Sequence, residues 1–432
     1  MSGELLLNEP ATASAGFLGA LPRSWRGLIH SPLDRTALLL ALWSVPISIA
    51  VAESFLAIAV LARMVSLARG EGRIALPRCF WFWLAWAGLE ILVWAFSPQP
   101  GRGWDEIRHL FLLAALFLVL PTLGQAADQR LAWEGIFLTS TLSSVFLVGD
   151  FVSRLFYYRR EISAGGDVAL YLRSGGLLNH WMVYGTVEVL VVAGLISFWS
   201  AYPEERRRAW PVVAINGIAV FLSLTRMLWV TSLLLLGISG ARRRSKWNWA
   251  LPLLPLSLYV LGPTVVRLRV RQSITPSYYS NAERLEMLRV AWKMVRAHPL
   301  TGVGPGRVAQ LYMSYLSPHD PVPAWHGHLH NTLAQIAAQF GIPVTLAALL
   351  FVAVLFHDLV NASRAVQDQD ERFIVRAAIL SLVGYTVASL FEYTYGHSLG
   401  LILLAFAVLP PLLPAPRSVK AKDRAPGDNL FA

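Results

Sequence analysis

Three histidines at alternating positions, His326, His328 and His330, are the residues of this sequence best suited to chemistry. They lie at the end of its only long polar interruption, just before an apolar stretch. Alternating imidazoles on an extended segment could supply the first shell of a zinc ion, or the histidines could simply bind headgroups or backbone at an interface. A third interpretation makes one of them, with His330 the first candidate, a general base, because a neutral imidazole accepts a proton near pH 7.

The elements that position these histidines must be membrane helices. Hydrophobic residues make up 55% of the chain and charged residues only 15%, a composition that predicts a polytopic membrane protein. In a soluble protein the net charge of +11 would suggest nucleic-acid binding. In a membrane protein the basic residues are first assigned to the two faces of the bilayer. The single cysteine, Cys79, excludes a disulfide framework and a cysteine-based metal site. No basic region precedes an apolar core at the N-terminus, so we expect no cleavable signal peptide.

We expect an all-α fold of about twelve transmembrane helices, from the lengths of the apolar runs. An even number of spans places both termini on the cytoplasmic side. The expected organisation is a cytoplasmic segment 1–35, spans 1 to 9 within 36–266 with 36–68 as a tight hairpin, a long helical periplasmic loop 267–329, spans 10 to 12 within 330–414, and a basic cytoplasmic tail 415–432.

A single charge, Arg226, interrupts the apolar run 210–240. Basic clusters flank this run on both sides, and short basic flanks belong in the cytoplasm. Two cytoplasmic flanks require two crossings, so the turn Ser223–Arg226 is predicted to face the outside. An arginine at that depth usually has an anionic partner.

Further candidates lie in the two outer loops. The sequence from Asn281 to Pro299 has helical periodicity, and Arg284 near its start is predicted to point at the same anion as Arg226. Arg289 and Arg160 are predicted to join them, although a solvated basic face would explain these arginines as well. Glu161 follows Arg160 directly and forms either a local ion pair or a carboxylate that orients a base.

Three other patterns are less informative. The glycine-rich stretch 302–307 lacks a preceding strand and the full GxGxxG spacing, so we predict a tight loop and no dinucleotide site. The DxD pattern at Asp368 and Asp370 lies in a predicted cytoplasmic loop and is interpreted as a solvated turn. Glu90 and Glu188 lie within predicted spans, where ionisable groups can mark a transport path.

The order of these motifs resembles the O-antigen ligase and polymerase superfamily. An arginine at an outer turn (SLTRMLW, Arg226) is followed by Arg284 and a PLTGVGPG stretch in the large loop. A His-Asn pair (His330, Asn331) and an apolar helix that reaches Gly341 come next. The motifs cover about 220–341, and the similarity in topology covers nearly the whole chain.

The resemblance implies a glycosyltransferase of the GT-C type that works on the periplasmic face of the bacterial inner membrane without a metal or another cofactor. Ligases of this family move O-antigen from undecaprenyl pyrophosphate to the lipid A core. By carry-over, Arg226 and Arg284 would bind the pyrophosphate and His330 would be the catalytic histidine, with His326, His328 and Asn331 as secondary candidates. The alternatives are an O-antigen polymerase that uses the same donor, and a transporter or flippase of the polyprenyl-linked glycan.

Overall fold

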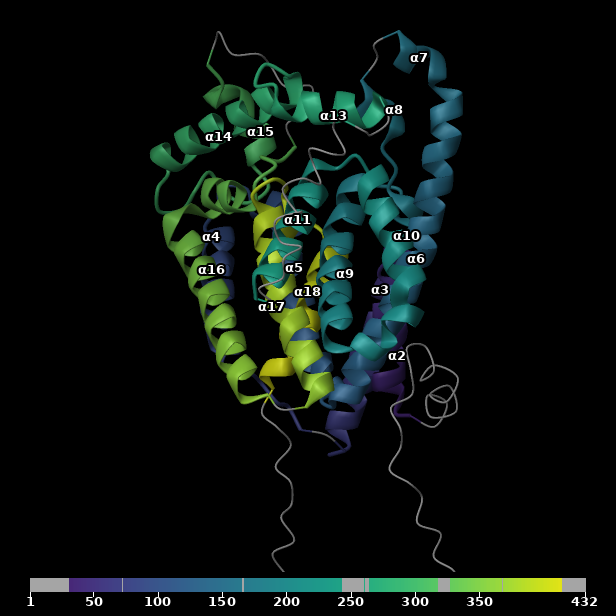
Figure 1. Cartoon of the computed structure of the whole chain (residues 1–432). Helices are drawn as coiled ribbons and strands as arrows, with labels where there is room; N and C mark the ends of the chain where they lie inside the picture. The colour runs from purple at the N-terminus through teal and green to yellow at the C-terminus, as the bar shows by residue number, and fades with distance from the viewer. Residues whose placement is uncertain are drawn as a thin grey trace, which may run out of the picture.

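The described part of the chain is helical throughout. The computed structural model describes residues 31–71, 73–164, 167–242, 260, 264–317, 327–366 and 368–413, and these ranges contain no strand (Figure 1). The α-helices are α2 (Leu33–Ser44), α3 (Ile49–Ala68), α4 (Cys79–Ala95), α5 (Trp104–Val119), α6 (Ala126–Tyr157), α7 (Arg159–Ser163), α8 (Val168–Leu172), α9 (Trp181–Ala201), α10 (Arg206–Leu222), α11 (Arg226–Arg242), α13 (Thr264–Ile274), α14 (Tyr279–Ala297), α15 (Val308–Tyr315), α16 (Thr332–Ala365), α17 (Gln369–Ser389) and α18 (Ser398–Val408).

Several of these helices are long and apolar enough to cross a membrane. Within the described ranges six meet that standard, including α6, α9, α16 and α17, and three shorter apolar helices accompany them. The chain is therefore a polytopic helical membrane protein. The number twelve stays a prediction, and most of the expected ninth span, 248–266, lies outside the described residues.

Two helical hairpins occupy the overlong apolar runs. Between 36 and 68 the helices α2 and α3 pack against each other, with Pro46 in their connection. In the second run, α10 and α11 meet at a three-residue turn, 223–225, in which Leu224 has a left-handed backbone with φ of 51°. A non-glycine residue in that region is strained, so the turn just before Arg226 is a specific conformation held by its surroundings.

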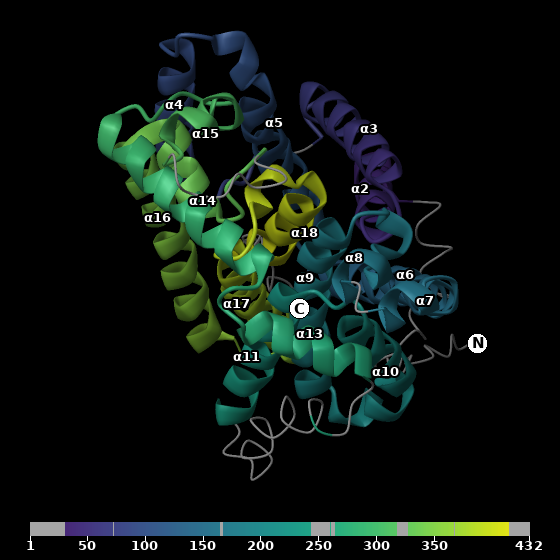
Figure 2. The ribbon, with the colours of Figure 1, turned by 90° about the horizontal axis from the view of Figure 1, so that it is seen from above.

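One end of the bundle carries five helices that are absent from the apolar membrane-crossing set. The helices α7, α8, α13, α14 and α15 gather there, and we call it the loop-rich end (Figure 1). Seen from above, α13 and α14 lie across the end of the bundle (Figure 2). The start of α16 is fixed at the same end, because α14 and α15 both pack against α16. The site described below lies under this cover.

The glycine-rich loop fills a break in α16. At Gly341 the backbone turns to φ of 83°, which leaves the carbonyls before it without their helical partners. The amide of Val303 donates to Ala338 O at 2.8 Å, and that of Gly304 donates to Gln339 O at 3.0 Å. A Cβ at Gly302 would lie 2.4 Å from the backbone of Gln339, so only glycine fits. The loop thereby holds the first half of α16.

The DxD pattern has a structural role at the opposite end. The carboxylate of Asp368 caps α17 by accepting from the amide of Asp370 at 2.9 Å. The side chain of Asp370 in turn pairs with Arg130 of α6 at 3.1 Å, and Arg130 also pairs with Glu134 at 2.9 Å. These contacts join α6 to α17, so the pattern is an interhelical clamp where the sequence had suggested a solvated turn.

Candidate active site

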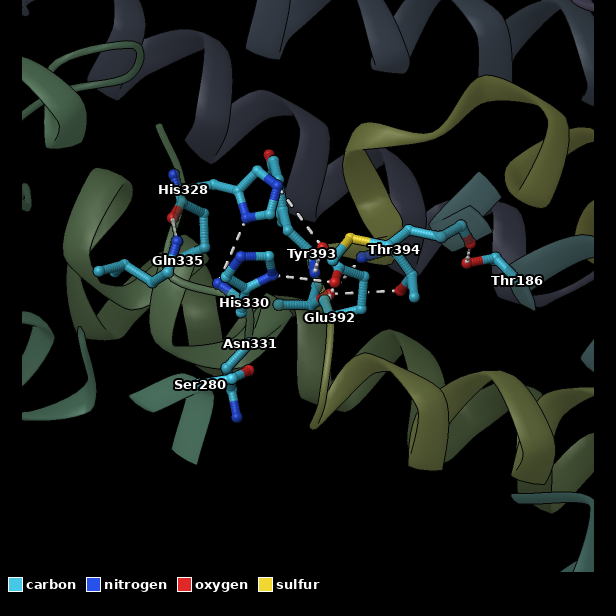
Figure 3. Close-up of polar contacts among 12 residues, drawn as sticks. Thr186, Ser280, His328, His330, Asn331, Gln335, Glu392, Tyr393 and Thr394 are labelled. Atoms are coloured by element: carbon cyan, nitrogen blue, oxygen red, sulfur yellow. Dashed lines mark hydrogen bonds and ion pairs between the residues drawn. The ribbon is translucent and has the colours of Figure 1, made fainter. Parts of the chain in front are cut away.

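A buried carboxylate, Glu392, holds two of the three histidines. His330 Nδ1 lies 2.9 Å from Glu392 Oε2, and His328 Nε2 lies 3.5 Å from Glu392 Oε1 (Figure 3). The two imidazole centroids are 4.5 Å apart, and Glu392 itself is only 2% exposed. The third histidine, His326, lies outside the described residues. A histidine paired with a buried carboxylate has its tautomer and orientation fixed.

Local hydrogen bonds bring these residues together from distant parts of the chain. Asn331 caps α16 by accepting from the amide of Ala334 at 2.9 Å, and its Nδ2 donates to Leu390 O at 3.0 Å. Thr332 Oγ1 donates to Glu392 O at 3.0 Å and accepts from the amide of Thr394 at 3.0 Å. The first turn of α16 is thus attached to the segment that follows α17, which sets the distance between His330 and Glu392.

The electrostatics of this group favour an ionised carboxylate. Burial alone would raise the pKa of Glu392, but the hydrogen bond from His330 and the charges of the histidines and Arg284 lower that pKa to about 2. Burial lowers the pKa of His328 to about 3, against the opposing charge of Glu392. Burial also lowers the pKa values of His180 and His397, two further histidines on which Glu392 acts.

An arginine cluster adjoins the carboxylate. Arg173, Arg226 and Arg284 line one small cavity of about 20 Å³, together with Glu392. Arg226 Nη1 donates to Asn281 Oδ1 and its Nη2 donates to Ser280 Oγ at 3.1 Å, so the start of α14 orients it. The guanidinium of Arg173 lies over the Trp181 ring, 5.7 Å from its centroid. Three arginines and Glu392, the carboxylate that pairs with His330, therefore line one cavity.

The structure brings together most, but not all, of the residues that the sequence suggested. His328, His330, Asn331, Arg226 and Arg284 lie around Glu392 and its cavity. By contrast, Arg160 and Glu161 are exposed on α7, and Arg289 forms a pair with Glu286 at 3.0 Å. The structure does not bring these three residues into the cavity wall.

Two residues of the site were not singled out from the sequence. Glu392 belongs to none of the motifs, and Arg173 lies in a polar segment with several other arginines. The available signal for Glu392 was its position at the end of an apolar run. Only its positive charge distinguishes Arg173 in the sequence.

The same group has the composition of a metal site. One ligand atom each from His328, His330 and Glu392 lie within 4.8 Å of one another, which is the two-histidine, one-carboxylate set of some zinc enzymes. The charge of Arg284 acts on Glu392 and opposes a cation there.

Membrane-crossing helices with a buried histidine–carboxylate pair beside clustered arginines define a polytopic membrane protein with an enzyme-like site. Residues 211–349, about a third of the chain, match the family model described as O-antigen ligase, so this segment is similar to that family. The matched segment includes Arg226, Arg284 and His330, whereas Arg173 and Glu392 lie outside it. No curated protein matches the chain.

Proposed function

We propose that the chain is a glycosyltransferase of the bacterial inner membrane, which transfers O-antigen polysaccharide from undecaprenyl pyrophosphate to the lipid A core. Its site would face the periplasm. The observation that carries the proposal is that one cavity is lined both by arginines suited to a pyrophosphate and by Glu392, the partner of His330. The similarity of residues 211–349 to the O-antigen ligase family model supports the same reaction class.

In the proposed mechanism His330 is the general base. Its Nδ1 pairs with Glu392, so Nε2 is the atom that takes the proton from the acceptor hydroxyl. The acceptor oxygen bonds to the anomeric carbon while the bond from that carbon to the pyrophosphate oxygen breaks, and the pyrophosphate leaves with the electron pair. Direct displacement inverts the anomeric centre. Glu392 stabilises the imidazolium that forms, and general base catalysis contributes about 10²- to 10⁴-fold.

The arginines would act on the leaving group. Departure of a pyrophosphate concentrates negative charge on its oxygens, and preorganised guanidinium groups stabilise that charge in a site from which water is largely excluded. Arg226 and Arg284 are the residues in this role. Because guanidinium groups supply positive charge without a metal ion, we propose a metal-independent reaction.

An apolar cavity supports a lipid-linked donor. It measures about 190 Å³ and lies between α4, α5, α16, α17 and α18. Thr332 and Leu390 line it. Thr332 Oγ1 donates to Glu392 O, and Leu390 O accepts from the side chain of Asn331, the neighbour of His330. A prenyl chain in this cavity would place its pyrophosphate near the arginines.

The test is transfer by the purified protein from the polyprenyl-pyrophosphate-linked glycan to the lipid A core, with and without EDTA. Glycosylated lipid A formed equally in both samples supports the ligase and the metal-independent mechanism. Loss of product in EDTA, with recovery by zinc, would refute metal independence and assign the His328–His330–Glu392 group to an ion. Glycan that lengthens on its polyprenyl carrier would replace the ligase by a polymerase, and transport of the carrier without chemistry would make the chain a flippase.

A further inference from the structure

A fourth arginine, Arg269 of α13, is buried next to the cavity arginines. Its side chain is 0% exposed, and its Nε donates to Leu224 O at 3.1 Å in the turn that precedes Arg226. Among the described residues, neither Nη1 nor Nη2 has a partner with good hydrogen-bond geometry, and Tyr278 is the side chain that interacts with this guanidinium. A buried guanidinium with unpaired donors destabilises the fold unless an anion reaches it.

The charges around Arg269 do not balance. Arg173 lies in the electrostatic field of Arg269, Arg226 and Arg284, and burial together with these three cations lowers the pKa of Arg173 to about 9. The Nε atom of Arg173 is also buried without a partner among the described residues. Positive charge therefore accumulates around the cavity.

The carboxylates that face this cluster are fewer than the arginines. Asp167 acts on Arg269 and Arg173, and it already accepts from the hydroxyls of Tyr278 at 2.7 Å and Tyr279 at 2.6 Å. Glu392 acts on Arg284 but is paired with His330, and Glu283 also acts on Arg284. Positive charge therefore remains in excess around the cavity.

The donors of Arg226 are already in use. Its two Nη atoms bond to Asn281 and Ser280, so only some of the N–H donors of its guanidinium remain for an anion. Arg173 lines the cavity beside it. A diphosphate carries two phosphate groups, each of which can take a bidentate guanidinium, and Arg226, with both Nη atoms bonded, does not offer a free pair of donors to one of them.

We infer that Arg173 and Arg269 complete a four-arginine site for a diphosphate. Arg173 binds it in the cavity wall, and the buried Arg269 supplies the additional charge and holds the Leu224 turn that carries Arg226. The inference rests on the proposed function, in which the donor is a pyrophosphate. It adds a specificity: two linked phosphates are bound much more tightly than one.

The experiment measures calorimetric binding of inorganic pyrophosphate, methylenediphosphonate and inorganic phosphate to the full-length protein in nanodiscs. We expect the wild type to prefer both diphosphates to phosphate. Arg173→Gln should weaken diphosphate binding by about 10- to 10²-fold, as the loss of a charge-assisted bidentate contact does, while phosphate binding changes much less. Arg269→Gln should behave similarly, whereas Arg269→Lys, which keeps the charge, should retain most of the affinity. Arg159→Gln, exposed on α7, is the matched control.

The outcomes separate the two proposals. Wild-type diphosphate binding in both Arg173→Gln and Arg269→Gln, with loss in Arg226→Gln and Arg284→Gln, overturns the inference and leaves the proposed function intact. A wild type that does not prefer diphosphate to phosphate refutes the pyrophosphate assignment of the whole site. Melting temperature without ligand identifies a variant that fails to fold. If Arg269→Gln fails in this way, Arg173→Gln and Arg269→Lys decide the matter.

Discussion

Glu392→Gln is the substitution that most sharply tests the role of the buried carboxylate. Glutamine keeps the shape and can still accept a hydrogen bond from His330 Nδ1, now 2.9 Å from Glu392 Oε2, but it carries no charge. It therefore supports the neutral imidazole and no longer stabilises the imidazolium that forms when the acceptor is deprotonated. A hydrogen bond to a charged group contributes about 1.5–3 kcal/mol, which corresponds to a loss of about 10- to 10²-fold in kcat.

The assay is steady-state transfer with purified enzyme at varied donor concentration. Because the lost interaction forms in the transition state, kcat should fall while KM for the donor changes by less than about threefold. Asp105→Asn, a carboxylate with 79% of its side chain exposed on the same end of the bundle, is the control and should leave both constants unchanged. Full kcat in Glu392→Gln would refute the assignment of His330 and Glu392 as a catalytic pair.

Three further predictions concern stability and assembly of the site. The free energy of unfolding should fall as pH is lowered from about 7 toward 3. The unfolded chain protonates His328 at its ordinary pKa of 6.5, whereas the folded chain does so only near 3. Melting curves at several pH values measure this, and an unchanged dependence of melting temperature on pH in His328→Gln would contradict it. Gly302→Ala should lower the melting temperature markedly, since its Cβ would lie 2.4 Å from backbone atoms, whereas Gly217→Ala, with open space around it, should not. Asn331→Ala should destabilise by about 1 kcal/mol through loss of the helix cap and reduce kcat; denaturant melts and transfer rates that match wild type would refute the attachment of α16 to Leu390.

The parts of the fold set by local composition could be predicted from the sequence. The α10–α11 turn follows from basic flanks and a lone Arg226 in an apolar run. The number of spans is harder to predict, because a count from apolar length assumes that every helix is long enough to cross the bilayer. Real helices such as α2, with 12 residues, fall short of a membrane thickness.

Some residues of the site could likewise be predicted from the sequence, and others could not. His330, Arg226 and Arg284 could be singled out from the sequence. Arg226 is a lone charge in an apolar run, Arg284 lies near the start of a periodic helix, and His330 directly precedes an apolar stretch. The partner of His330 could not be predicted, since Glu392 lies 62 residues further along the chain and the contact depends on how α16 and α17 pack. Arg160 and Glu161 were favoured for their adjacency in sequence, yet α7 carries them outside the cavity wall, while Arg173 reaches the cavity from the same loop.

The central claim is that His330, a base paired with the cavity residue Glu392, acts together with the cavity arginines, which stabilise a departing pyrophosphate. Its most direct test is a single-turnover measurement of glycosylated lipid A and free polyprenyl pyrophosphate in wild type and His330→Ala. Equal amounts of the two products from the wild type, with a rate loss of at least about 10²-fold in the variant, are predicted, and the anomeric configuration should be inverted. Transfer at the wild-type rate by His330→Ala, or a retained configuration, would contradict the mechanism.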